Sequence, residues 1–95
     1  MLDSPSLSDD DLLRLISAGN EKAFLTFYRK HQSAVFRFAL HMSGKPEVAE
    51  EVTQDVFVVV MSAAEQFDSQ RGSAGGYLYG IARNVVRRCL ERERP

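Results

Sequence analysis

The sequence predicts an all-α fold, in which three long helices and one short N-terminal helix form a single bundle. Apolar residues recur at steps of three and four through most of the 95-residue chain, which is the period of an amphipathic helix. Helix-capping residues, glycines and a proline separate these periodic stretches. Residues 56–61 (VFVVVM) have the composition of a buried strand, but no second strand candidate can pair with them. We therefore expect helix there as well.

The short helix is expected from residue 8 onward, whereas residues 1–7 are expected to be disordered or weakly ordered. Ser8 is a good N-cap, and the run Asp9, Asp10 and Asp11 suits the positive end of a helix. The same three carboxylates can in principle bind a divalent ion, but we favour the capping interpretation. Gly19 is expected to end this helix.

The second and third helices are expected to supply most of the core. Asn20 caps the second helix, Gly44 ends it, and Pro46 fits the first turn of a third helix over residues 46–66. The second helix has a broad aromatic face that we interpret as core: Phe24, Phe27, Tyr28, Val35, Phe38, Ala39 and Met42. The third helix has this inward stripe: Ala49, Val52, Val56, Val59, Val60, Ala63 and Phe67.

The outward stripe of the third helix mixes apolar and acidic residues: Glu47, Glu51, Gln54, Val58, Met61 and Glu65. An apolar centre flanked by carboxylates and an amide resembles a protein-docking patch. The alternative is a solvated acidic face that happens to carry a valine.

The last helix is expected over residues 76–90, after a glycine-rich turn in which Ser73 can act as the cap. One side of this helix is apolar and includes the single cysteine, Cys89, which we expect to be a buried, inert thiol. The other side carries Gly80 together with Tyr77, Asn84, Arg87 and Arg88. An aromatic ring, an amide and guanidinium groups can stack on bases, read base edges and hold phosphates. A solvated basic face is the alternative.

The charges are divided along the chain, although the formal net charge is only −1. Residues 71–95 hold six arginines and two glutamates, which gives +4. Residues 1–70 hold six basic and eleven acidic residues, which gives −5. An acidic body with a basic end is consistent with a nucleic-acid-binding helix at that end.

Composition and motifs also restrict the class of protein. A single cysteine excludes an internal disulfide, the acidic N-terminus is not a signal peptide, and no apolar run approaches the ~20 residues of a membrane span. We therefore expect a cytoplasmic protein that does not engage a membrane. No nucleotide-binding glycine loop, catalytic triad or clustered histidines can be identified, so we expect no enzymatic activity, no cofactor and no metal.

Three segments, in this order, resemble domain two of the bacterial extracytoplasmic-function sigma factors of RNA polymerase: GNEKAFLTFYRKH, AEEVTQDVF and FDSQRGSAGGYLYGIARNVVRR. The resemblance extends over about residues 9–94, and it implies the helical bundle of sigma domain two for residues 8–95. It also implies a function in transcription initiation, in which the domain binds core polymerase and recognises and melts the promoter −10 element.

The resemblance further implies roles for particular residues. Contacts with the coiled coil of the polymerase's largest subunit fall on Glu51, Gln54 and Asp55. Contacts with −10 DNA, on the non-template strand, fall on Arg71, Ser73, Tyr77, Arg83, Asn84, Arg87 and Arg88. An anti-sigma factor is a further partner that the family implies.

The chain departs from the family pattern at several positions. Ala74 stands where an aromatic residue is usual, and Gly75 and Gly80 stand where basic residues are common.

The helix-turn-helix domain that reads the −35 element is absent from this sequence, so we expect a fragment of a longer regulator. Two other functions remain open, namely a helical module that binds duplex DNA without melting a promoter and a bundle that binds only proteins.

Overall fold

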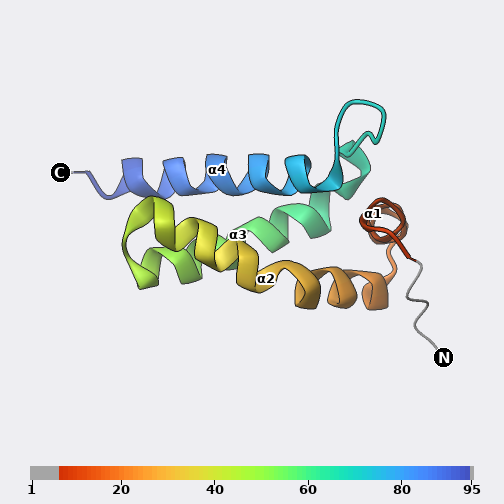
Figure 1. Cartoon of the computed structure of the whole chain (residues 1–95), viewed down its shortest axis with the longest axis horizontal. Coiled ribbons are helices and arrows are strands. Elements are labelled where there is room, and N and C mark those ends of the chain that lie inside the picture. The colour runs from red at the N-terminus through yellow and green to blue at the C-terminus, as the bar shows by residue number, and fades with distance from the viewer. Residues whose placement is uncertain (1–6, 95) are drawn as a thin grey trace.

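The computed structural model describes residues 7–94 and confirms the all-α fold in that range (Figure 1). The elements are α1 (Asp9–Ser17), α2 (Glu21–Ser43), α3 (Pro46–Ala63), a single 3₁₀ turn η1 (Ala64–Gln66) and α4 (Ala74–Arg92). The prediction that residues 1–7 are weakly ordered falls mostly on residues 1–6, which lie outside the described residues.

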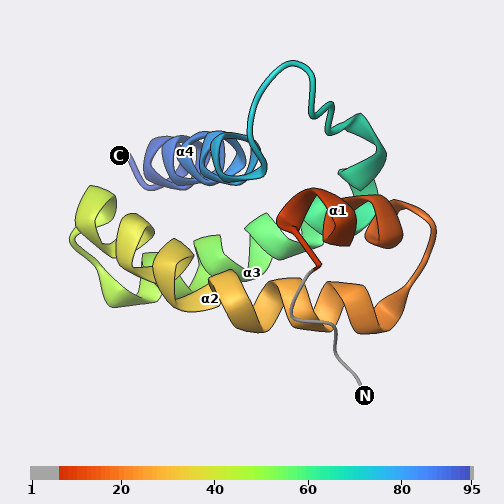
Figure 2. The same ribbon diagram turned by 45° about the vertical axis from the view of Figure 1, so that its right-hand side comes forward.

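The three long helices pack side by side, and α1 lies across one end of them. Figures 1 and 2 show α4 running along one side of the α2–α3 pair, with α1 next to η1 and the start of α2. The loop between η1 and α4 projects at the same end as α1. The molecule is elongated, with principal extents of 49 × 26 × 19 Å. Within residues 7–94, no helix combines the length and apolarity that crossing a bilayer requires.

The core lies where α2, α3 and α4 meet, and α1 covers its open end. The largest fully buried side chains are Phe27, Leu13, Leu78, Val35, Val48, Val52, Val56, Val60, Val85, Val86 and Cys89. Burying an apolar side chain of this size contributes about 1.5–3 kcal/mol relative to leaving it exposed. The cysteine is buried, as expected from its position on the apolar side of α4.

The strand-like run of valines is helical because tertiary packing outweighs strand propensity. Val56 and Val60 face the core, and Phe57 is also buried although it lies outside the predicted inward stripe. The Phe57 ring packs edge-on against Tyr28 of α2, with ring centroids 5.0 Å apart. Met42 was predicted to lie in the core, but it is exposed in the last turn of α2.

The expected caps of α1 and α2 are present and have a local cause, whereas α3 ends at Ala63 and not at residue 66, because residues 64–66 form the 3₁₀ turn η1. The Ser8 hydroxyl accepts from the Asp11 amide at 3.0 Å, and the Asp11 carboxylate accepts from the Ser8 amide at 3.1 Å. The Asn20 side chain accepts from the Ala23 amide at 2.9 Å and begins α2. Gly44 ends α2 in the left-handed conformation, with φ of 72°.

Asp9 does more than favour the start of a helix, because it anchors α1 to α2. Its carboxylate accepts from Lys30 Nζ at 2.9 Å and lies 3.0 Å from His31 Nε2. Burial raises the pKa of the Asp9 carboxyl, but the hydrogen bonds with Lys30 and His31 outweigh burial and hold the pKa below its usual value. Only Asp11 of the three aspartates completes the capping box.

We predict that Gly80→Ala stabilises the protein and Gly44→Ala destabilises it. A methyl group at Gly80 meets open space within α4, so alanine gains about 0.5–1 kcal/mol of helix propensity. At Gly44 the left-handed backbone costs an alanine about 1 kcal/mol or more. Urea denaturation of the two variants checks both signs, and a destabilised Gly80→Ala variant would contradict the continuity of α4.

We also predict a pH-dependent effect of Asp9→Asn. Because the folded-state pKa of this carboxyl is lowered, its stabilisation is complete above the unfolded-state pKa of 3.8 and is lost as the pH falls through the folded-state pKa. Asp9→Asn should therefore reduce the free energy of unfolding at pH 7, and the difference from wild type should shrink towards pH 3. Asp10→Asn is the matched control, since Asp10 forms no ion pair within residues 7–94. An equal loss from both variants would contradict the anchoring role.

Candidate nucleic-acid interface

The loop before α4 is held by short-range hydrogen bonds. The Asp68 carboxylate accepts from the Gln70 amide at 2.9 Å, and the Asp68 carbonyl accepts from the Arg71 amide at 3.0 Å. The Ser73 hydroxyl then accepts from the Gly76 amide at 2.9 Å and caps α4, as predicted. The helix begins two residues earlier than expected, at Ala74, and this alanine is buried.

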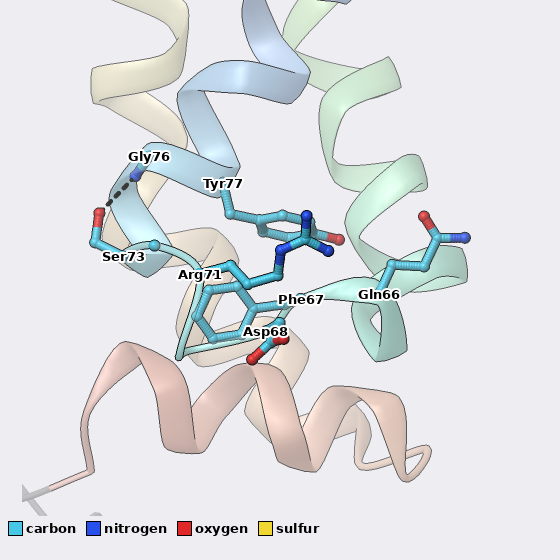
Figure 3. Close-up of a pocket in the computed structure, with 8 residues that line it drawn as sticks. Gln66, Phe67, Asp68, Arg71, Ser73, Gly76 and Tyr77 are labelled. Carbon is cyan, nitrogen blue, oxygen red and sulfur yellow. Dashed lines mark hydrogen bonds between the residues drawn. The ribbon is translucent and has the colours of Figure 1, made fainter.

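This loop and the first turn of α4 border an open pocket of about 450 Å³ (Figure 3). Its lining is Gln66, Phe67, Asp68, Arg71, Gly72, Ser73, Gly76 and Tyr77. The lining combines two aromatic rings, a guanidinium group, a carboxylate and an amide, and the volume lies in the range of small-ligand sites. A planar, polar-edged group such as a nucleobase meets both stacking surfaces and hydrogen-bonding partners there.

Tyr77 lies differently from the sequence-based expectation. Its ring is half-buried rather than fully displayed on the polar side of α4, and its hydroxyl donates to the Ala63 carbonyl at 2.9 Å. The ring also packs against Phe67, with centroids 5.3 Å apart. Burial, with a smaller contribution from Glu65, raises the pKa of the Tyr77 hydroxyl, so it stays protonated and remains a donor.

Further along α4, the predicted polar side is open to solvent. Arg83, Asn84, Arg87 and Arg88 are all exposed. The Arg87 guanidinium donates to the Asn84 side-chain oxygen at 3.1 Å, which leaves the amide NH₂ of Asn84 able to donate outward. A shallow groove of about 480 Å³ runs beside Asn84, Arg87 and Arg88, and its lining also includes Val59 of α3 and Glu91. We call Arg83, Asn84, Arg87 and Arg88 the arginine face.

Arg92 is turned away from the arginine face and pairs with Glu51 of α3. Nearby, Lys45 Nζ lies 3.1 Å from the Glu93 carboxylate. These two pairs attach the end of α4 to α3. The two pairs engage one arginine and one glutamate of residues 71–95, so five arginines and one glutamate remain and the +4 counted from the sequence is unchanged. Glu91 and Arg94 offset each other, which leaves the positive charge on Arg71, Arg83, Arg87 and Arg88.

The predicted outward stripe of α3 is exposed, with one modification. Val58 and Met61 are 60% and 55% exposed, which is unusual for large apolar side chains, and Gln54 and Asp55 beside them are also exposed. Glu51 is half-buried and engaged by Arg92 rather than free. We call Gln54, Asp55, Val58 and Met61 the α3 stripe.

One group of side chains within residues 7–94 has the composition of a metal site. Ligand atoms of Glu51, Asp55 and Cys89 lie within 4.8 Å of one another. However, burial and then the nearby Glu51 raise the pKa of the Cys89 thiol, and a protonated thiol is a poor metal ligand. Arg92 Nη2 also lies 3.8 Å from Cys89 Sγ and already supplies a positive charge to the carboxylates. We therefore interpret the group as a buried thiol next to the Arg92–Glu51 ion pair and not as a metal site.

The structure separates the candidate residues into three places. Arg71, Ser73 and Tyr77 line the pocket, Arg83, Asn84, Arg87 and Arg88 form the arginine face, and Glu51, Gln54 and Asp55 lie on α3. The pocket's other walls, Gln66 and Phe67, were not among the residues predicted from the sequence. Gln66 lies in the η1 turn and has no helical period of its own. The helical period assigned Phe67 to the inward stripe of the third helix, but α3 ends at Ala63 and Phe67 follows η1.

Comparisons with known proteins agree with this geometry. A family profile described as Sigma-70 region 2 matches residues 27–95. The chain is 33% identical over 96 residues to the ECF RNA polymerase sigma factor SigK of Mycobacterium tuberculosis (strain ATCC 25618 / H37Rv), an alignment that covers 99% of this chain and 50% of the relative. It is also 33% identical over 85 residues to the SigK of Mycolicibacterium vanbaalenii, covering 90% of this chain and 42% of the relative.

The chain thus spans about half the length of the curated relatives it matches. No solved structure matches it.

Proposed function

The chain belongs to the Sigma-70 region 2 family, and on that premise we propose that it is the part of an extracytoplasmic-function sigma factor that binds core RNA polymerase and recognises the promoter −10 element. The domain would comprise residues 8–95. Its partners would be core polymerase and the non-template strand of −10 DNA, so we expect it to act in the bacterial cytoplasm. It would supply promoter choice and strand separation, while the polymerase supplies the chemistry.

The observation that carries this proposal is the arrangement along α4. A pocket with aromatic and polar walls lies at the N-terminal end of the helix, and the arginine face follows on the same helix. A single strand laid along α4 can place a base in the pocket while its phosphates meet Arg83, Arg87 or Arg88. Asn84 is then available to donate to a base edge.

This arrangement would let the domain favour an open promoter through binding alone. A base enters the pocket only after it leaves the duplex stack, which costs a few kcal/mol. A domain that binds the unstacked strand better than the duplex therefore shifts the equilibrium towards strand separation by its differential affinity. The arginine face adds attraction for either form, because phosphates are present in both.

The α3 stripe is proposed as the surface that docks on the coiled coil of the polymerase's largest subunit. Val58 and Met61 offer an exposed apolar centre, and Asp55 and Gln54 offer an acceptor and an amide beside it. An apolar centre within a polar rim is the usual composition of a protein–protein contact. Because Glu51 is paired with Arg92, a basic group on the polymerase would compete for it. An anti-sigma factor that covers the same stripe would block polymerase binding.

We predict that Asp55→Arg and Val58→Glu each weaken binding to core RNA polymerase by about tenfold or more. Asp55→Arg reverses a charge that is complementary to the polymerase, and Val58→Glu places a charge in the apolar centre of the contact. Both side chains are exposed, so neither change should affect the fold. Pull-down or biolayer interferometry with purified core polymerase measures the effect.

Glu21→Arg is the matched control for that experiment, since Glu21 is an exposed acid at the start of α2 and outside the α3 stripe. Binding that is unchanged by both stripe variants would argue against polymerase docking at α3.

We predict that the double variant Arg87→Ala/Arg88→Ala weakens binding to single-stranded DNA and lowers the slope of log affinity against log salt by roughly 1.4, because each phosphate that an arginine neutralises accounts for roughly 0.7 of that slope. Fluorescence anisotropy with a labelled single strand, from low to moderate salt, measures both quantities. Arg29→Ala is the control, because Arg29 is an exposed arginine on α2.

Single-stranded DNA should also compete better than duplex of the same sequence. A preference for duplex would favour a DNA-binding module without promoter melting. An unchanged salt slope in the double variant would favour a bundle that binds proteins only.

A further inference from the structure

We propose that Tyr77 is a positioning residue, whose hydroxyl latches the loop of residues 67–73 into the shape that admits a base. This inference rests on the proposed function, because it concerns the same pocket. It differs from the role implied by the family resemblance, in which Tyr77 itself contacts the −10 strand. In the structure its hydroxyl is directed at the protein backbone instead.

The latch joins two places that the loop separates. Tyr77 stands in the first turn of α4, and its hydroxyl donates to the carbonyl of Ala63, the last residue of α3, at 2.9 Å. Carbonyl groups in the last turn of a helix have no partner within that helix, so a donor from outside satisfies one of them. The single hydrogen bond thereby closes the η1 turn and the whole loop into one ring of chain.

The same side chain also forms a wall of the pocket. Its ring packs on Phe67, the residue at which η1 ends, with centroids 5.3 Å apart and planes inclined at 55°. Figure 3 shows the Phe67 and Tyr77 rings close together, with Arg71 extending into the same opening. The position of Phe67 relative to Arg71 thus depends on where Tyr77 holds the end of α3.

Beyond Phe67, which packs against the core, the loop has few other constraints. Most of its side chains are exposed, and its internal hydrogen bonds are the short-range ones from Gln70 and Arg71 to Asp68. Such a loop samples several shapes unless a tertiary contact selects one, and a pocket formed only part of the time binds more weakly in proportion. A preformed pocket is the benefit of the latch.

The test uses Tyr77→Phe, which removes the hydroxyl and keeps the ring against Phe67. The control is Tyr79→Phe, the same change on the same helix, where the ring packs on Phe38 of α2 instead. The probes are fluorescein-labelled 10-mer strands that are abasic except for a central A, C, G or T, and a fully abasic strand. The ratio of abasic to base-containing dissociation constants gives the contribution of the base alone.

We expect Tyr77→Phe to reduce that ratio roughly two- to tenfold for the preferred base, the range expected for loss of one hydrogen bond. The dissociation constant for the fully abasic strand should be unchanged, since the arginine face is intact. Amide hydrogen exchange of Gln70 and Arg71 should become faster in Tyr77→Phe, whereas Tyr79→Phe should change neither quantity.

The outcomes separate the two proposals. If wild type gains no affinity from any central base, the pocket does not take a base, and the proposed −10 recognition fails together with the latch. If wild type shows the gain and Tyr77→Phe retains it in full, only the latch is overturned. Equal losses for abasic and base-containing strands would show a general structural defect and would also overturn it.

Discussion

The fold depends on the burial of one side of α4 against α2 and α3. Leu78, Ala82, Val85, Val86 and Cys89 are removed from water on that side. Because a helix places residues on fixed directions around its axis, burying this side obliges the opposite side to face solvent. The arginine face is therefore a consequence of core formation. Guanidinium groups remain hydrated there, since burying them without partners would cost far more than the core gains.

The same packing determines where the other surfaces lie. α3 contacts both α2 and α4, and the α3 stripe lies on the exposed part of the helix, where Asp55 and Val58 border α4. The pairs of Arg92 with Glu51 and of Lys45 with Glu93 attach the end of α4 to α3. Exposed pairs of this kind add little stability. Each pair engages one cation and one carboxylate, and the α4 arginines outside these pairs are the exposed Arg83, Arg87 and Arg88.

The pocket is formed differently from the two helical surfaces. It is formed by a loop whose polar side chains hydrogen-bond mainly with near neighbours, and it is limited by the two helix ends on either side. Loops positioned by a rigid scaffold commonly carry binding residues. In this chain the scaffold is the α3–α4 pair, and Tyr77 connects the loop to it.

The sequence by itself determined the number of helices, the capping at Ser8, Asn20 and Ser73, and the division of α4 into an apolar and a polar side. These are properties of residues three or four positions apart, so a helical period or a cap motif reveals them. Tertiary structure alone decided that Asp9 meets His31, that Tyr77 turns inwards to Ala63 and that Arg92 engages Glu51, contacts across 22, 14 and 41 residues of sequence. Such partners have no periodic signal, because they are brought together by the way the helices pack and not by the spacing of residues along any one of them.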